Sequence, residues 1–381
     1  MKIGITGTRG IPNRYGGFEQ MTQYLSKGLV ERGHEVFVYN PHNHPYHENN
    51  WNGVNIIHCY DPEYKIGTAG QFIYDLNCIN DARKRNFDVL LHLGYSSDSV
   101  WHWRWPKNTI NMMNMDGLEW KRSKYNKLTR QFLKRAEYLA VKNSQVLIAD
   151  SLKIQQHIMA RYGKIATYIP YGADVFTESD PAVLKNYNLL PYHYYLVISR
   201  LEPENNIEMI IKGHQATEQN DPLLIIGGIT NKYAEHLLKN YQSSNVIFAG
   251  AVYDQNTVNN LRYYSTYYFH GHSVGGTNPS LLEAMACRCN IAAHRNVFNQ
   301  SVLHNDSEYF SSAEDIRDII ASSENQILTN QRKEMNVQKI RTIYNWENIV
   351  NSYELLMLKA VSPEIKKVIS INTPASKAVS G

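Results

Sequence analysis

The sequence predicts an α/β protein built of two consecutive doubly wound domains. Short β-branched runs alternate with stretches of helical periodicity up to about residue 170, and the same alternation starts again near residue 194. Strands that alternate with helices at this spacing are typical of βαβ units and parallel sheets. With 381 residues and 43% apolar side chains, the chain is long enough to bury two cores.

The first domain is expected over residues 1–172. β-branched runs predict strands at Lys2–Thr6, Glu35–Tyr39, Asn55–Cys59, Val89–Leu93, Thr109–Met113, Val146–Ala149 and Ala166–Ile169. Amphipathic periodicity predicts helices at Phe18–Arg32, Gly70–Arg85, Leu128–Asn143 and Ser151–Tyr162. Gly33 follows the first helix, where a C-terminal cap favours glycine.

The second domain is expected over residues 173–341. Its strands are predicted at Tyr194–Ser199, Pro222–Ile226, Val246–Ala249, Tyr267–His270 and Asn290–Ala293, and its helices at Ile207–Gln219, Ala234–Tyr241, Asp254–Tyr263 and Leu281–Cys287. Residues 342–360 contain a last helix, Thr342–Leu358, which we expect to cross back to the first domain. Residues 361–381 are small and polar and predict a loose tail.

Several classes of protein are disfavoured by composition. No run approaches 18 apolar residues, which disfavours a membrane-spanning helix, and the first residues lack the pattern of a signal peptide. The four cysteines, Cys59, Cys78, Cys287 and Cys289, form no CxxC pair, so we expect reduced thiols in a cytoplasmic protein. A net charge of +4 and the lack of an RNA-binding motif argue against a nucleic-acid partner.

A glycine turn follows the first strand. Residues 6–13 read TGTRGIPN, and a strand that runs through glycines into a helix forms a cradle for phosphate. Arg9 and Arg14 flank this turn and could add charge-assisted hydrogen bonds. A dinucleotide-binding turn is a weaker alternative, because Asn13 replaces its third glycine and no acid ends the second strand. Glycines that serve only close packing are another alternative.

The strongest pattern in the second domain is the loop that precedes the helix at Leu281–Cys287. Residues 267–286 read YYFHGHSVGGTNPSLLEAMA. Backbone amides from Gly276 to Ser280 could bind a diphosphate at the helix N-terminus, and Glu283 could accept hydrogen bonds from sugar hydroxyls. The alternative is that Glu283 only favours its own helix dipole.

Several segments together resemble a known family. SLLEAMA at 280–286 resembles the donor-site motif of GT-B glycosyltransferases of family 4, and IPYGAD at 169–174 and SRLEPENN at 199–206 resemble two more of its segments. GTRGIP at 7–12, YGGFE at 15–19 and DGLEWKR at 116–122 resemble the narrower group of DUF1972-type bacterial rhamnosyltransferases. The resemblance implies a GT-B fold, with two Rossmann-like domains that face a central cleft.

The resemblance also implies a donor site, with two departures. Gly275 stands where the family usually has a first glutamate, and Asn205 stands where it has a diphosphate-binding lysine. Neutralising the diphosphate would then fall to Arg200, Arg9 and backbone amides. The donor-binding residues implied are Arg9, Gly16, Gly17, Arg200, Gly275, Gly276, Thr277, Asn278, Ser280, Leu281 and Glu283, and the catalytic residues are Asp116, Arg200 and Glu283.

The family implies a retaining transfer in which the leaving phosphate accepts the proton of the acceptor. The chain has no Asp-x-Asp motif, so we expect no metal and no cofactor besides the nucleotide-sugar donor. His270 and His272 are more simply explained by one packed ring and one ring that donates to a carbonyl than by a metal site. Asp116 matches the position that faces the transferred sugar, although an Asp-Gly turn explains it nearly as well. The narrower group favours dTDP-β-L-rhamnose as donor.

A basic run with interleaved aromatic residues lies at 120–135. Lys121, Arg122, Lys124 and Lys127 could bind an anionic membrane surface, where a lipid-linked glycan acceptor resides. A solvated helix face is the alternative. We therefore expect a peripheral enzyme at the inner face of the cell membrane, acting in capsule or exopolysaccharide assembly. A catalytically silent GT-B binding protein and a GT-B sugar-nucleotide epimerase remain alternatives.

Overall fold

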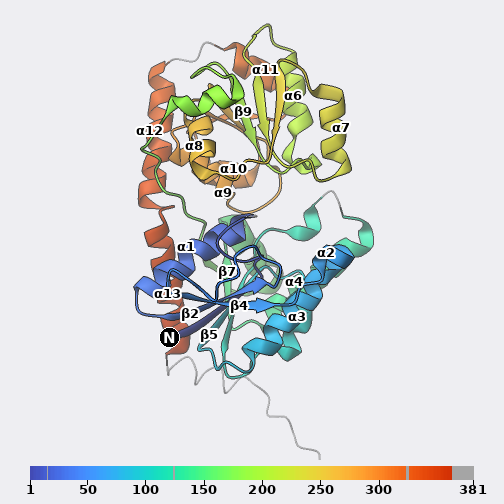
Figure 1. Ribbon diagram of the computed structural model, residues 1–381, viewed down its shortest axis with the longest axis vertical. Helices are drawn as coiled ribbons and strands as arrows, with labels where there is room; N and C mark the ends of the chain where they lie inside the picture. Colours follow the sequence, from blue (N-terminus) through green and yellow to red (C-terminus); the bar gives the residue numbers. More distant parts are fainter. Residues whose placement is uncertain (15, 123–124, 323–325, 363–381) are drawn as a thin grey trace, which may run out of the picture.

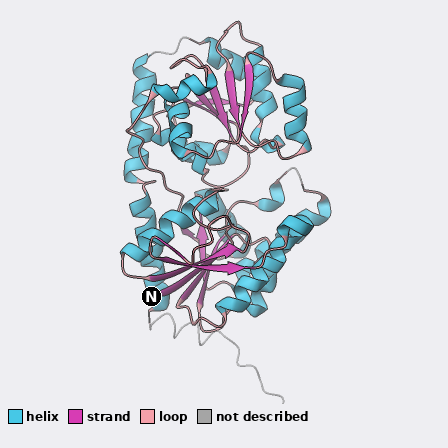
Figure 2. Cartoon of the chain, viewed as in Figure 1, coloured by secondary structure: helices cyan, strands magenta, loops and turns pink. Residues whose placement is uncertain are grey.

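The computed structural model describes residues 1–14, 16–122, 125–322 and 326–362. Within these residues the chain forms two α/β domains, and helices flank the strands of each sheet (Figures 1 and 2). Both halves are doubly wound, which confirms the predicted fold class.

The first sheet has the strand order β3-β4-β2-β1-β5-β6-β7-β8. Every neighbouring pair is parallel except the short pair of β3 and β4. All side chains of β5 are buried, as expected for a parallel strand that is covered on both faces. The strands are β1 Lys2–Thr6, β2 Glu35–Pro41, β3 Asn50–Trp51, β4 Val54–Cys59, β5 Val89–Leu93, β6 Ile110–Asn114, β7 Val146–Ala149 and β8 Thr167–Tyr168.

The second sheet is parallel throughout, with the order β11-β10-β9-β12-β13-β14. Its strands are β9 Tyr195–Ile198, β10 Leu223–Ile226, β11 Val246–Gly250, β12 Tyr267–His270, β13 Ile291–His294 and β14 Glu308–Phe310. In each sheet the chain winds first to one side of the starting strand and then to the other. The strand order therefore reverses between β1 and β5, and again between β9 and β12.

The helices agree with the predicted ones to within a few residues, and several short ones are additional. The first domain contains α1 Gly17–Glu31, α2 Glu63–Ile66, α3 Gly70–Ala82, α4 Lys127–Asn143 and α5 Leu152–Tyr162, and the 3₁₀ turns η1 Gly67–Ala69, η2 Ser99–Arg104 and η3 Glu119–Lys121. The second contains η4 Pro181–Tyr187, η5 Pro203–Asn205, α6 Ile207–Gln215, α7 Lys232–Tyr241, α8 Gln255–Tyr263, α9 Pro279–Ala286, α10 Val297–Leu303 and α11 Ala313–Ala321.

The end of the chain differs from the single helix predicted over Thr342–Leu358. Two helices occur here, α12 Gln326–Thr342 and α13 Trp346–Val361. The side chain of Asn345 starts the second helix, because its Oδ1 accepts a hydrogen bond from the amide of Asn348 at 2.8 Å. In Figure 1, α12 runs along the second domain and α13 lies beside α1 of the first.

Helix α13 packs against α1. The rings of Tyr24 and Trp346 stack with centroids 4.4 Å apart. Gly28 lets the two helices approach, because a Cβ there would lie 2.9 Å from both methyl carbons of Val350. The C-terminal helix therefore belongs to the packing of the first domain, although the chain reaches it through the second.

Candidate active site

Loops from the carboxyl ends of the two sheets meet between the domains. In the first domain they follow β1, β6 and β7, and in the second they follow β9 and β12. The loops after β1, β9 and β12 lie where the strand order reverses. Open α/β sheets bind ligands at such points.

The glycine turn after β1 brings the start of α1 to the second domain. Gly7 has a φ of +84°, and a Cβ there would lie 2.3 Å from a carbonyl oxygen of β5. The N-cap of α1, Gly16, provides no side-chain cap, and a Cβ on Gly17 would lie 3.0 Å from Cγ of Pro279 at the start of α9. The first turns of both helices are thus adjacent, and the amides at the start of α1 suit an anion. Tyr15 of the predicted motif lies outside the described residues.

Arg9, one of the predicted donor contacts, pairs with an acid of its own domain. Its Nη2 donates to Oε1 of Glu63 at 2.7 Å and its Nε donates to Oε2 at 3.2 Å. Its backbone amide donates to the carboxylate of Glu19 at 2.8 Å. Because the pair with Glu63 is bidentate, the Arg9 guanidinium is engaged within the first domain, and its contact with a diphosphate stays a prediction.

Arg200 and Asp116 belong to different domains, and the charge of Arg200 acts on the carboxyl group of Asp116. Asp116 follows β6 with a φ of +47°. Burial and the nearby carboxylate of Glu119 raise the pKa of Asp116 to about 6, and the charges of Arg122 and Arg200 oppose this rise. The side chain of Arg200 is exposed and has no hydrogen bond or ion pair to a described residue. Its guanidinium is therefore available to an anion.

Asn205, which replaces the family's lysine, holds the loop of Arg200 in place. Its Nδ2 donates to the carbonyl oxygen of Arg200 at 2.7 Å. The adjacent Asn206 donates through Nδ2 to the carbonyl oxygen of Gly271 at 2.8 Å. These bonds join the loops after β9 and β12, so the departure from the family pattern has a structural role here.

The loop between β12 and α9 closes against the first domain. A Cβ on Gly117 would lie 3.4 Å from Cα of Gly275. A Cβ on Gly276 would lie 2.1 Å from both carboxylate oxygens of Asp150, and the hydroxyl of Thr277 donates to the carbonyl oxygen of Asp150 at 2.5 Å. The loop predicted to hold the donor therefore lies against the ends of β6 and β7.

Two of the predicted donor amides are already engaged. Oδ1 of Asn278 caps α9 by accepting from the amide of Ser280 at 2.9 Å. The amide of Leu281 donates to the carbonyl oxygen of Asn278 at 3.0 Å, and the side chain of Leu281 is buried. The amides of Ser280 and Leu281 are therefore occupied within the protein, and the predicted amide contacts to the donor are left to the loop that precedes them.

Glu283 is held by residues of both domains, Arg262 and Gln255 of the second and Gln20 of the first. Its Oε2 lies 2.5 Å from Nη2 of Arg262, whose side chain is only 2% exposed. Its Oε1 accepts a hydrogen bond from Nε2 of Gln20 on α1 at 2.7 Å. The carboxyl group is thus oriented where the two domains meet.

Comparisons with known proteins agree with this architecture. Residues 1–174 match the family model "Domain of unknown function (DUF1972)", and residues 186–343 match "Glycosyl transferases group 1". Sucrose-phosphate synthase from Thermosynechococcus elongatus is 15% identical, with a TM-score of 0.75 over 95% of this chain and 99% of its own. Anabaena Alr3699/HepE, in complex with UDP and glucose, is 13% identical, with a TM-score of 0.74 over 94% and 99%.

The chain has the GT-B fold of glycosyltransferases. The trehalose 6-phosphate synthase of Burkholderia multivorans shares this fold, at 10% identity and a TM-score of 0.70 over 99% of both chains. The match of residues 186–343 to the glycosyl transferases group 1 model supports glycosyl transfer as the general activity. No curated protein is significantly similar in sequence.

Three residues of the GT-B site were missed by sequence reasoning. Asp150 follows β7 as Asp116 follows β6, so an acid at the carboxyl end of a predicted strand was a usable signal. Arg262 shares the buried face of α8 with Val258 and Leu261, and a charge on an apolar face indicates a buried partner. Gln20 carries no signal in the sequence, because its contact depends on how the domains meet.

Only part of the basic run at 120–135 is exposed to solvent. Lys121 and Lys127 are exposed, whereas Lys124 lies outside the described residues. The guanidinium of Arg122 donates to both oxygens of Glu119 at 2.8 Å and to Glu204 of the second domain at 3.3 Å. The expectation that Arg122 faces a membrane is therefore corrected, since it is an ion-pair partner between the domains.

The histidines after β12 differ from the expected arrangement. The rings of His270 and His272 stack at 4.3 Å, and neither hydrogen-bonds a backbone carbonyl of a described residue. Burial and the charge of Arg200 lower the pKa of His272 to about 3, so its ring is neutral. Across the described ranges, no three His, Cys, Asp or Glu side chains gather as a metal site requires.

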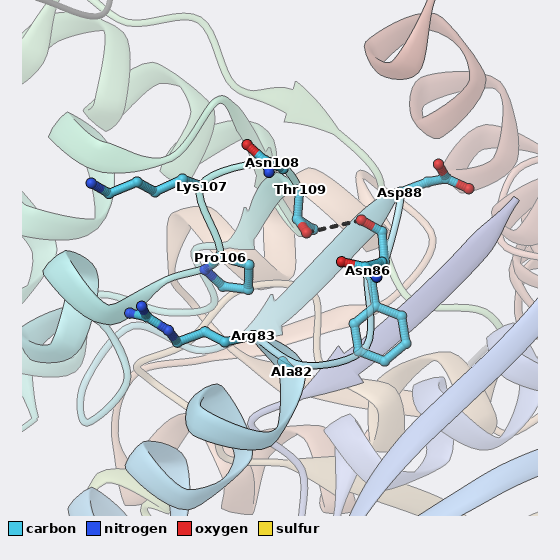
Figure 3. A pocket seen from close by; sticks show the side chains of 9 residues that line it. Ala82, Arg83, Asn86, Asp88, Pro106, Lys107, Asn108 and Thr109 are labelled. Carbon is cyan, nitrogen blue, oxygen red and sulfur yellow. Dashed lines mark hydrogen bonds between the residues drawn. The ribbon is translucent and has the colours of Figure 1, made fainter. Parts of the chain in front are cut away.

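Two further findings concern the rest of the molecule. Figure 3 shows a hollow of about 280 Å³ near the amino ends of β5 and β6, lined by Arg83, Asp88, Lys107 and Thr109 among others. It lies at the edge of the first sheet opposite to the interdomain loops. In the part of the chain that the structure describes, no helix has the length and apolar character needed to cross a membrane.

Proposed function

We propose that the protein is a retaining, metal-independent glycosyltransferase that moves L-rhamnose from dTDP-β-L-rhamnose to a lipid-linked oligosaccharide during bacterial capsule or exopolysaccharide assembly. The observation that carries the proposal is the available guanidinium of Arg200, which faces Asp116 beside the adjacent starts of α1 and α9. A cation and free helix amides between two such domains suit the diphosphate of a sugar nucleotide.

Each group of the site has a role in this reaction. Arg200 and the amides near Gly16, Gly17 and Gly276 stabilise the charge that develops on the leaving diphosphate. Asp116, whose pKa is about 6, is ionised at neutral pH and orients the acceptor hydroxyl. The leaving phosphate takes the acceptor's proton on the same face of the sugar, which preserves the configuration at the anomeric carbon.

Glu283 serves the nucleoside end of the donor. An ionised carboxylate accepts hydrogen bonds only, and ribose offers two hydroxyl donors. In the free protein the amide of Gln20 occupies one oxygen of Glu283. A ribose hydroxyl would therefore replace the Gln20 contact when the donor enters.

The acceptor side is proposed to lie on the first domain, against the inner face of the membrane. Lys121 and Lys127 are exposed, and the apolar side chains of Leu128 and Phe132 on α4 are exposed next to them. Cations beside apolar side chains suit an anionic bilayer surface. A lipid-linked glycan presented there could reach the interdomain site.

A catalytically silent GT-B protein that binds sugar nucleotides is the second candidate. The replacement of the family's lysine and glutamate by Asn205 and Gly275 favours it, because both changes remove charge from the donor site. An epimerase is separated from both candidates by the same experiment.

The test is nucleotide release by the purified protein with dTDP-rhamnose or UDP-glucose, with and without a lipid-linked disaccharide and with EDTA present. Release of dTDP that depends on the acceptor supports rhamnosyl transfer. Release of UDP instead supports transfer of another sugar. Binding without turnover supports the silent protein, an altered sugar without acceptor supports an epimerase, and loss of turnover in EDTA contradicts metal independence.

A further inference from the structure

A buried carboxyl group that the proposed reaction does not use lies at the end of β7. Asp150 is 2% exposed and stands between the strand and the N-cap of α5, Ser151, which provides that helix cap itself. Buried acids are normally paired with a cation or fully hydrogen-bonded, because an isolated buried charge is costly. Asp150 therefore needs a physical explanation.

Its surroundings within the described residues leave one oxygen without a partner. Oδ1 of Asp150 is inaccessible to solvent and has no hydrogen bond there. No salt bridge to Asp150 occurs among the described side chains. The charged residue that changes the pKa of Asp150 is a second acid, Asp116. Backbone amides of Asp150 and Thr277 are the polar groups that approach the carboxyl.

The carboxyl group of Asp150 lies against the loop between β12 and α9, which is proposed to bind the donor. Both its oxygens would be 2.1 Å from a Cβ on Gly276, so a residue with a side chain could not occupy this position without displacing Asp150. The Thr277 hydroxyl fixes the same loop to the backbone of Asp150 at 2.5 Å. Asp150 is thus held at the surface where the two domains meet, beside Asp116 and Gly276.

The raised pKa of Asp150 favours its protonated form. Burial and the charge of Asp116 raise the pKa of Asp150 well above its ordinary range, whereas that of Asp116 is raised to about 6. A carboxylic acid has both a hydrogen-bond donor and acceptors, which matches a sugar hydroxyl and suits a diphosphate poorly.

We propose that the unpartnered Oδ1 side of Asp150 hydrogen-bonds a hydroxyl of the transferred sugar, and that Asp150 thereby selects which sugar the site accepts. This inference rests on the proposed function, because it requires a sugar nucleotide between the domains. A buried polar group that a substrate hydroxyl must satisfy rejects substrates that lack that hydroxyl. Asp150 is then a specificity residue next to Asp116.

The test compares the affinity for a sugar nucleotide with that for the free nucleotide. Isothermal titration measures binding of dTDP-rhamnose and dTDP, and of UDP-glucose and UDP, to the wild type, Asp150→Ala and Asp150→Asn. Asn keeps the size, the neutrality and both hydrogen-bonding roles of the acid. Asp75→Asn is the matched control. Asp75 lies on α3 and is also a buried acid with a raised pKa, but its Oδ2 accepts a hydrogen bond from the hydroxyl of Ser97.

Asp150→Ala should weaken binding of the accepted sugar nucleotide about tenfold or more, while binding of the free nucleotide stays the same. Asp150→Asn should lose less than about threefold, and Asp75→Asn should behave as the wild type. Equal losses for both ligands, or no loss in Asp150→Ala, would overturn the inference alone. A wild-type protein that binds none of the four ligands would overturn the proposed function as well.

Discussion

The Nη2 atom of Arg262 lies 2.5 Å from the Oε2 atom of Glu283, and the guanidinium is almost fully buried. The same Nη2 contacts the hydroxyl of Ser280 at 3.1 Å, and Nη1 donates to Oδ1 of Asn259 at 3.2 Å. Arg262 thus lies against the first turn of α9 and orients the carboxyl group of Glu283.

Breaking this buried ion pair from one side should be costly. Arg262→Met leaves the charge of Glu283 without its partner and should lower the free energy of unfolding by about 3 to 5 kcal/mol. The double variant Arg262→Met with Glu283→Gln should regain part of this loss, because neither charge then remains. Urea unfolding followed by circular dichroism measures both. A double variant that is less stable than the single one would contradict the pairing.

Loss of either donor contact should slow the reaction. Arg200→Ala and Glu283→Ala should each reduce turnover by about 10²-fold or more, because each removes a charge-assisted contact of about 2.7 kcal/mol. Arg317→Ala is the control, since Arg317 on α11 pairs with its exposed neighbour Asp318. Nucleotide release under saturating acceptor is the measurement. Wild-type rates in both site variants would contradict the site assignment.

The pH profile should report Asp116. Its pKa of about 6 lies above the ordinary value, so the carboxylate that faces Arg200 is lost as the pH falls through 6. We expect kcat/KM to be constant above pH 7 and to fall about tenfold per pH unit below pH 6. Asp116→Asn should be slow and should lack this acid limb. A limb that persists unchanged in Asp116→Asn would assign it to another group.

The chain crossing between the domains should be sensitive to a single methyl group. A Cβ on Gly172 would lie 2.6 Å from Cδ2 of Trp346, the first residue of α13. Gly172→Ala should therefore destabilise the protein by about 1 to 3 kcal/mol through overpacking. At Gly228, the nearest atom would be 3.4 Å away, so Gly228→Ala is a matched control in the unfolding experiment. Equal stability of the two variants would contradict the tight crossing.

Membrane binding should depend on the exposed cations of the first domain. Lys121→Gln with Lys127→Gln should lower the fraction that sediments with anionic liposomes, and more so at low salt, where screening is weak. Lys212→Gln on α6, also exposed, should have no effect. A bound fraction that is unchanged in the double variant would argue against this surface.

Most of the fold follows from periodicity. Most strands of both sheets lie within one or two residues of their predicted positions, because parallel strands covered on both faces consist of apolar runs. The short edge strands β3 and β14 were not predicted. The helix α12 was missed because its sequence is mostly polar, and only its second half buries apolar side chains such as Val337 and Ile340. The break before α13 depends on the cap at Asn345, a single polar residue that composition does not distinguish from its neighbours.

The site was predictable where one loop carries it and unpredictable where two domains share it. Arg200 and the loop of Gly275 and Gly276 follow β9 and β12 at the carboxyl edge of the second sheet, and their contacts with a donor stay a prediction. Arg9 pairs with Glu63, and Arg122 pairs in part with Glu204 of the second domain. No local sequence pattern identifies such pairs. Local sequence shows which side chains carry charge, whereas tertiary packing decides which of those charges remain available.

The proposed site depends on where the diphosphate of the donor binds. A crystal structure of the protein with dTDP or UDP measures this position most directly. We predict that the phosphates lie between the first turns of α1 and α9, within hydrogen-bond distance of the Arg200 guanidinium and of amides at Gly16, Gly17 or Gly276. A nucleotide bound elsewhere, such as the hollow near Arg83 and Lys107, with Arg200 free of contacts, would contradict it.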